Sequence, residues 1–247
     1  MERSGRLGVG IIGSGRVGPV LGAALAGAGH RIIGITASDE AARDRVEAVL
    51  PGAPILSTEQ VVERSELVLI AVPDEQLPGL VSGLAAVGAW QPGQLVVHTA
   101  PGHGYGVLAP ALAAGAIPLA LHPAIRFTGT SLDLVRLREA TVAVTAPGPV
   151  QPIGQALAVE MGAEPVLIAE ADRPAYAEAL ATAADFATAL VAQASGLLDG
   201  IGVEHPAHVL GPVLRSAVEN ALGVRGVDSF DLAALDAASG LEEGPER

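Results

Sequence analysis

Three glycines near the start of the chain have the spacing of a phosphate-binding turn. Residues 7–18, LGVGIIGSGRVG, are an apolar run that breaks at Gly13, Gly15 and Gly18. In a G-x-G-x-x-G motif the first glycine allows a tight turn after a strand, the second lets a diphosphate approach the backbone, and the third lets a helix pack closely. The free N–H groups and the dipole at the helix start would attract the phosphates. We expect a dinucleotide to bind along the whole turn, formed by Gly13, Ser14, Gly15, Arg16, Val17 and Gly18.

The neighbouring sequence decides whether this match carries weight, because 31 glycines in 247 residues produce chance matches. A strand-like run precedes the turn at 7–12, a helix-compatible stretch follows at 16–29, and a second strand-like run lies at 31–36. Together they form a βαβ unit of about 30 residues. The context favours a nucleotide-binding turn over the alternative, a structural glycine turn in an unrelated α/β protein.

A short polar segment follows the second strand-like run, where the adenosine ribose of a dinucleotide would lie. Ser38, with Arg43 or Arg16 nearby, would suit a 2′-phosphate and therefore NADP. If Asp39 instead points into the pocket, its charge would repel that phosphate and favour NAD. A structural alternative makes Ser38 the N-cap of the next helix and Asp39 an acid of its first turn. We expect NADP, with NAD as the alternative.

Polar side chains close two later strand-like runs, at the edge where open α/β sheets bind ligands. His98 and Thr99 end one run, His122 ends the next, and Arg126 follows. The sequence has no Lys and no Cys, which excludes Schiff-base and thiol chemistry. His122 is therefore the expected general acid or base, because a free imidazole titrates near neutral pH. Arg126 could hold a substrate carboxylate, and Thr99 and His98 could orient a carbonyl or an amide. A structural role at a strand end explains either histidine equally well.

Composition excludes several classes of protein. A net charge of −13 and six aromatic residues argue against a nucleic-acid partner. Gly, Pro or charge interrupts each apolar stretch before membrane-spanning length, and no cleavable signal precedes the first strand-like run. No His, Asp and Glu set has metal-site spacing. We expect a soluble cytoplasmic protein without a metal.

Strand-like runs alternate with helical patterns through the first two thirds of the chain. Strands are expected at 7–12, 31–36, 55–56, 67–72, 95–99, 117–121, 141–145 and 166–169, with helices between them at 39–50, 58–64, 74–87 and 107–114. Such alternation predicts an α/β domain with a Rossmann-like, doubly wound, mostly parallel sheet. We place this domain at residues 1–169.

The remaining residues, 170–247, are expected to form a smaller, all-helical domain. Apolar residues alternate four and three apart over 172–200, and a second helix is predicted at 206–222. Two helices cannot bury that much apolar surface by themselves. We expect a homodimer built on these helices, with an intramolecular cap as the alternative.

The segments GIIGSGRVG, VLIAVPDEQL, VVHTAPGHG and LALHPAIRFTG resemble a largely bacterial oxidoreductase-like family. In that family a Rossmann-like NAD(P)-binding domain precedes a C-terminal domain of unknown function. It is similar to the 6-phosphogluconate dehydrogenase, pyrroline-5-carboxylate reductase, ketopantoate reductase and prephenate dehydrogenase group. The resemblance runs from about residue 7 to 222.

The resemblance implies roles for three further positions and for two already named. The backbone of Val72 and Pro73 would line the nicotinamide ribose, and Asn220 would contact substrate. Thr99 and His122 resemble the Ser and His-Pro pair of prephenate dehydrogenases, in which the histidine polarises the substrate oxygen.

Two functions remain open at this point. The first is an NAD(P)-dependent oxidoreductase, NADPH-preferring, which moves hydride to or from a small carbonyl, imine or hydroxy-acid substrate. The second is a non-catalytic dinucleotide-binding sensor or assembly protein. The polar cluster at the strand ends favours the first. The second is favoured by the C-terminal region, where the family's Thr-Gly-Pro and Arg-Gly-Asp segment is reduced to residues 225–228.

Overall fold

The computed structural model describes residues 6–223; residues 225–228, discussed above, lie outside this range. The chain divides into two compact units, one ending at Thr182 and the other beginning at Ala183. The division into domains expected after residue 169 stays a prediction.

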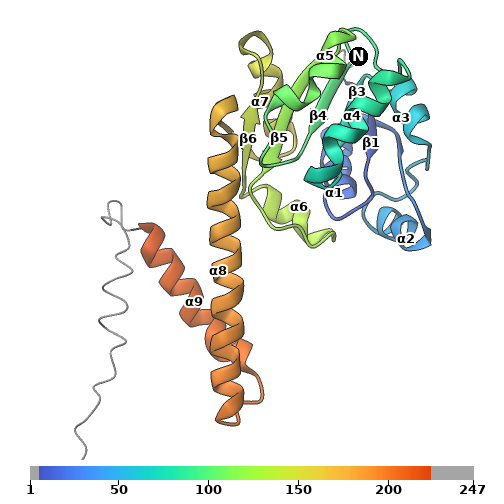
Figure 1. Ribbon diagram of the computed structural model, residues 1–247. Helices are drawn as coiled ribbons and strands as arrows, with labels where there is room; N and C mark the ends of the chain where they lie inside the picture. The colour runs from blue at the N-terminus through green and yellow to red at the C-terminus, as the bar shows by residue number, and fades with distance from the viewer. Residues whose placement is uncertain (1–5, 224–247) are drawn as a thin grey trace, which may run out of the picture. The chain divides into compact units, whose positions relative to one another are not determined.

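The first unit is built on one sheet (Figure 1). Within the described residues its strand order is β2-β1-β3-β4-β5-β6-β7, and all neighbours are parallel except β5 and β6. The bounds of the strands are β1 Gly8–Ile12, β2 Arg31–Ile35, β3 Leu67–Ile70, β4 Leu95–His98, β5 Ile117–Pro123, β6 Thr141–Thr145 and β7 Glu164–Leu167. The expected Rossmann-like, mostly parallel sheet is confirmed. Every residue of β1, β3 and β4 is buried, as helices on both faces require.

Helices cover both faces of this sheet (Figure 1). They are α1 Gly18–Gly27, α2 Glu40–Val49, α3 Thr58–Arg64, α4 Leu77–Ala86, α5 Ala109–Ala113, α6 Leu132–Leu137 and α7 Gln151–Glu160. Alternate side chains of β3 divide between two cores: Leu67 and Leu69 pack with α1, α2, α6 and α7, and Val68 and Ile70 pack with α3, α4 and α5. Because successive strand residues point to opposite faces, a doubly wound sheet needs apolar residues at every strand position.

Some expected elements differ from the observed ones. Residues 55–56 form no strand; Ile55 makes an isolated bridge to Ile35, beside the backbone bonds of Pro54 and Leu56 to the same residue. The expected strand at 166–169 lies two residues earlier, as β7. Helices α6 and α7 were not among the expected elements, and four short 3-10 turns complete the unit: η1 Asp74–Gln76, η2 Tyr105–Leu108, η3 Gly148–Val150 and η4 Glu170–Asp172.

Two long helices end the described chain, as the apolar spacing predicts. Helix α8, Arg173–Gly200, begins in the first unit and extends into the second, and α9 is Pro206–Gly223. In the second unit many large apolar side chains of both helices are exposed. No helix among residues 6–223 has both the length and the apolarity that a membrane crossing needs.

Two glycines inside regular elements allow a matched test of the packing between β1 and α3. A Cβ at Gly10 in β1 would overlap the hydroxyl of Ser65 and lie 2.7 Å from Cγ1 of Val61, whereas a Cβ at Gly83 in α4 would meet open space. We expect Gly10→Ala to lower the free energy of unfolding by about 1–3 kcal/mol. Gly83→Ala should raise it by about 0.5–1 kcal/mol, because alanine loses less entropy in a helix. Urea denaturation of both variants checks this, and equal shifts would contradict the packing argument.

Candidate functional site

The carboxyl ends of four parallel strands surround one cleft of about 400 Å³ in the first unit. Strands β2 and β3 lie on opposite sides of β1, so the chain reverses its winding direction there, and this is where open α/β sheets bind ligands. The segments that line the cleft are Gly15–Val17 after β1, Ala71–Asp74 after β3, Thr99 and Pro101 after β4, and His122, Pro123, Ile125 and Phe127 at the end of β5.

The turn after β1 is held by close backbone contacts. Gly13 has a φ of 113°, and a Cβ there would overlap the carbonyl of Ala71. A Cβ at Gly18 would overlap the carbonyl of Gly13. The N–H of Gly13 donates to the hydroxyl of Thr36, 2.9 Å away at the end of β2. These contacts bring the start of α1 close to β3, as the first and third glycines of the motif predict.

The second glycine lies in a different environment. Gly15 is exposed, and a Cβ there would meet no atom within 4 Å. It precedes α1, whose N-cap, Val17, makes no side-chain capping bond. The first N–H groups of a helix have no partner within the helix, so they can bind an anion. The open space beside Gly15 and the uncapped helix end can therefore accept a phosphate.

The polar segment after β2 forms the cap of the next helix. Asp39 is the N-cap of α2: its carboxylate accepts from the N–H of Ala42 at 2.8 Å and from the hydroxyl of Ser38 at 2.9 Å. These hydrogen bonds, with smaller effects of Arg45 and Arg43, hold the pKa of Asp39 below its ordinary value. The N-cap is thus Asp39, where Ser38 was the residue considered for that position.

An arginine not among the expected site residues contacts the glycine-rich turn. Nε of Arg45 lies 3.4 Å from the carbonyl oxygen of Ser14. Arg43 and Ser38 are exposed at the start of the same helix, α2. The sequence could have pointed to Arg45 as a second basic residue of this segment, because it follows Arg43 by two residues.

His122 lines the cleft, and its ring is partly buried. Its Nδ1 lies 3.0 Å from the hydroxyl of Tyr176, and the two rings meet edge to face at 5.6 Å. Burial, and then the positive charge of Arg173, lower the pKa of His122 to about 4. The near-neutral titration of a free imidazole is therefore not expected here: at pH 7 the ring is neutral and acts through hydrogen bonds.

His98 and Thr99 lie beside each other but face different partners. His98 is fully buried; its Nε2 lies 2.9 Å from the carbonyl oxygen of Gly104, and its Nδ1 accepts from the N–H of Ala100 at 3.2 Å. Burial lowers the pKa of His98 to about 4. These contacts hold the 101–104 turn in place. Thr99 reaches the cleft, and its hydroxyl lies 3.5 Å from the carbonyl of Ile70.

Val72 and Pro73 line the cleft, and Asp74 follows them there. The contact of their backbone with a nicotinamide ribose stays a prediction. Burial raises the pKa of the Asp74 carboxyl, although the N–H of Gly102 acts in the opposite direction. Arg126 is exposed, between the cleft-lining residues Ile125 and Phe127.

Asn220 is exposed on α9, in the second unit, and its role stays a prediction. Among the described residues no group of three or more His, Asp or Glu side chains could hold a metal ion.

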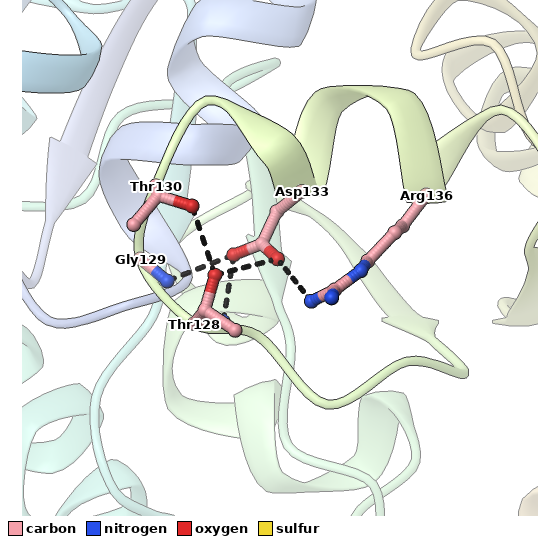
Figure 2. A network of polar contacts seen from close by, with 5 residues as sticks. All are labelled: Thr128, Gly129, Thr130, Asp133 and Arg136. Atoms are coloured by element: carbon pink, nitrogen blue, oxygen red, sulfur yellow. Dashed lines mark hydrogen bonds and ion pairs between the residues drawn. The ribbon is translucent and has the colours of Figure 1, made fainter. Parts of the chain in front are cut away.

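Figure 2 shows a polar network beside the cleft that sequence reasoning missed. Asp133 of α6 is buried and accepts from the N–H groups of Thr128 and Gly129 at 2.7 and 2.8 Å, from the hydroxyl of Thr128 at 3.0 Å, and from Arg136 at 3.3 Å. Burial alone would raise the pKa of Asp133, but these hydrogen bonds outweigh it and lower the pKa. The network fixes the loop that carries Phe127 into the cleft.

Two family profiles match the chain: a Rossmann-like domain over residues 2–123 and the domain of unknown function DUF2520 over residues 140–229. The chain thus combines a Rossmann-like domain with a C-terminal region that matches DUF2520. A comparison with curated proteins finds no match.

Solved structures share the fold of this chain at low sequence identity. A Bacteroides fragilis protein assigned as an NADP oxidoreductase is 18% identical with a TM-score of 0.71, covering 89% of this chain and 82% of its own. The Plasmodium falciparum pyrroline carboxylate reductase, solved with NADP bound, is 10% identical with a TM-score of 0.64, covering 97% and 86%. A reductive aminase from Aspergillus terreus, in complex with NADPH4, cyclohexanone and allyl amine, is 17% identical with a TM-score of 0.63, covering 87% and 75%.

The buried histidines predict how stability depends on pH. A histidine whose pKa falls from 6.5 in the unfolded chain to about 4 in the folded protein leaves the unfolded chain with more bound protons between these values. The free energy of unfolding should therefore fall as the pH is lowered from about 6.5 to about 4, by up to about 1.4 kcal/mol per pH unit for each histidine. His122→Gln should have a shallower slope in this window than the wild type, as measured by urea denaturation at several pH values. Parallel slopes would refute the assignment.

Proposed function

We propose that this chain is an NADP-dependent oxidoreductase that transfers hydride to or from a small carbonyl, imine or hydroxy-acid substrate. The observation that carries the proposal is the single cleft that joins the glycine-rich turn to Thr99 and His122. One end of this cleft can accept a diphosphate, and the other presents a hydroxyl and an imidazole. An enzyme of this class needs both on one surface.

The preference for NADP is supported by the charges at the start of α2. Both carboxylate oxygens of Asp39 already accept hydrogen bonds, from Ala42 and Ser38. Arg43 and Arg45 lie on the same helix, and Arg45 reaches the carbonyl of Ser14. Guanidinium groups bind phosphate through charge-assisted hydrogen bonds, so this region suits a 2′-phosphate. The structural neighbours solved with NADP and with NADPH4 add support.

In the proposed reaction a bound NADPH would supply the hydride. The residues of the chain would position the substrate and handle the proton. The neutral ring of His122 would bind the oxygen or nitrogen that gains the proton, and Thr99 would hold the same atom or the carboxamide of the cofactor. Asp74, whose pKa is raised by burial, lines the same cleft.

A titration of the protein with NADPH and with NADH, followed by ligand fluorescence, tests the cofactor. We expect tighter binding of NADPH than of NADH. Gly15→Asp should weaken NADPH binding at least ~10-fold, or about 1.4 kcal/mol, because it places a negative charge in the phosphate site. The space beside Gly15 is open, so the variant should keep the wild-type unfolding curve.

Gly79→Asp is the matched control, because Gly79 is also exposed and open but lies on α4. A screen of keto acids and cyclic imines then tests turnover. Tight binding without turnover of any candidate would favour a non-catalytic sensor or assembly protein. If neither coenzyme binds at millimolar concentration, the proposal is wrong.

We also propose that the second unit forms a homodimer. Its two helices expose large apolar side chains, among them Phe186 at 72% and Leu190 at 53% on α8 and Val213 at 59% on α9. Phe186 and Leu190 lie one turn apart on α8, and an exposed apolar patch often marks an interface. A second copy of the same chain offers the same face, as a two-fold dimer requires.

Light scattering after size-exclusion chromatography tests the dimer. The wild type should have twice the mass of the 24.7 kDa chain. Phe186→Glu places a charge on the apolar face and should shift the protein toward the monomer. Thr188→Glu adds the same charge at a polar, exposed position two residues along α8, on the side of the helix opposite Phe186, and should leave the dimer intact. A wild type that elutes as a monomer would exclude the homodimer.

A further inference from the structure

A fully buried arginine lies behind the cleft, at the start of α8. Nε of Arg173 donates to the hydroxyl of Thr145 at 2.7 Å, and Nη2 donates to the carbonyls of Ala120 and Ala143 at 2.9 and 3.0 Å. These partners are neutral atoms of β5 and β6. Arg173 therefore fixes the start of α8 to the sheet at the antiparallel pair, two residues before His122 on β5.

The guanidinium is costly to bury in this way. Its Nη1 is buried and has no hydrogen-bond partner among the residues that the structure describes. A buried charge is expected to be paired or fully hydrogen-bonded, and Arg173 is not. The ring of Tyr176, one turn along the same helix, lies 5.7 Å from Cζ of Arg173 and offers a π-face to the cation. Tyr176 thus lies between the buried charge and His122.

The contact between Tyr176 and His122 has a preferred direction. A neutral imidazole carries hydrogen on one nitrogen and accepts on the other, and a phenol can donate or accept. The phenol O–H is the stronger acid of the two, with an ordinary pKa near 10, so donation from Tyr176 to Nδ1 of His122 is favoured. Nε2 then carries the hydrogen, and it is the nitrogen with which His122 can reach a ligand in the cleft.

We propose that Tyr176, held by Arg173, donates its hydroxyl hydrogen to His122 and replaces the proton that His122 gives to the substrate. Tyr176 and Arg173 are positioning residues, since they act through His122. The inference rests on the proposed reductase function for its chemical step. The hydrogen bond from Tyr176 to His122, and the tautomer of His122 that follows from it, do not depend on the reductase function.

The protons of this step balance. As hydride from the reduced nicotinamide dinucleotide reaches the carbonyl or imine carbon, the substrate oxygen or nitrogen takes the hydrogen on Nε2 of His122. Nδ1 of His122 takes the hydrogen of the Tyr176 hydroxyl, so the imidazole stays neutral with its hydrogen now on Nδ1. Burial raises the pKa of Tyr176, and the Arg173 guanidinium over its ring acts in the opposite direction, so Arg173 lowers the cost of the negative charge left on the hydroxyl. Water then gives a proton to Nε2 of His122, and Nδ1 returns its hydrogen to Tyr176, which restores the starting arrangement.

Nitrogen-15 NMR of the ligand-free protein tests the hydrogen arrangement without any assay of activity. The signals of His122 are assigned by their loss in His122→Gln. In the wild type at pH 7 we expect the neutral tautomer with hydrogen on Nε2. Tyr176→Phe keeps the ring but removes the hydroxyl, so it should shift the Nδ1 signal and mix the two tautomers.

Tyr105→Phe is the matched control, because Tyr105 is the other tyrosine of the chain and lies in η2. It should leave the His122 signals unchanged. Hydrogen on Nδ1 in the wild type, or identical spectra for wild type and Tyr176→Phe, would overturn the inference even if NADPH binds. If NADPH fails to bind but the NMR result is as expected, the reductase function is wrong, and the hydrogen bond from Tyr176 to His122 still holds.

Kinetics with a substrate from the screen test the chemical step. Tyr176→Phe should lower kcat by about 10- to 100-fold, at or below the lower end of the range for proton-transfer groups, because the variant keeps His122. KM and the NADPH dissociation constant should change by less than about threefold, since ground-state binding does not use the hydroxyl. Tyr105→Phe should keep the wild-type kcat. An equal loss in kcat and NADPH affinity, or no loss of kcat, would refute the relay.

Discussion

The close approach of α1 to the ends of β1 and β3 is the constraint on which the site depends. Side chains at Gly13 or Gly18 would collide with backbone carbonyls, which cannot move aside as a flexible side chain can. Without that approach the uncapped start of α1 would stand away from the Val72 and Pro73 segment, and the cleft would lose one wall. The hydroxyl of Thr36 occupies the N–H of Gly13, so the later N–H groups of the turn are the ones directed to a ligand.

The opposite wall depends on polar groups buried at the junction of β5, β6 and α8. Here the sheet changes from parallel to antiparallel pairing, and Arg173 donates to carbonyls of both strands. The same charge lowers the pKa of His122, after burial itself. A neutral histidine in the cleft is therefore a result of packing, and the low pKa and the contact with Tyr176 have one structural origin.

The elements were predictable where one signal dominated. Continuous apolar runs marked β3 and β4, and the structure adds a capping box of Ser57 and Gln60 at the start of α3. The strand expected at 55–56 failed because its two residues pack beside Ile35 without a ladder, and α6 was too short to show a period. Within the site, residues at strand ends were predictable from the sheet alone. Arg173, Tyr176 and Asp133 were not, because their roles come from contacts across long stretches of sequence.

The Asp133 network extends the same logic to the loop between β5 and α6. Gly129, with a φ of 81°, packs against the backbone and Cβ of Arg16, and a Cβ at Gly129 would lie 3.3 Å from Cα of Arg16. The carboxylate of Asp133 holds Gly129 there by accepting a hydrogen bond from the N–H of Gly129 (Figure 2). The loop thus joins the end of β5, where His122 lies, to the glycine-rich turn at the other end of the cleft. Because a short backbone contact between two turns resists displacement more than a side-chain contact does, the two ends of the cleft are held at a fixed separation. A hydride donor and a proton donor that must meet at one substrate atom require such a fixed separation.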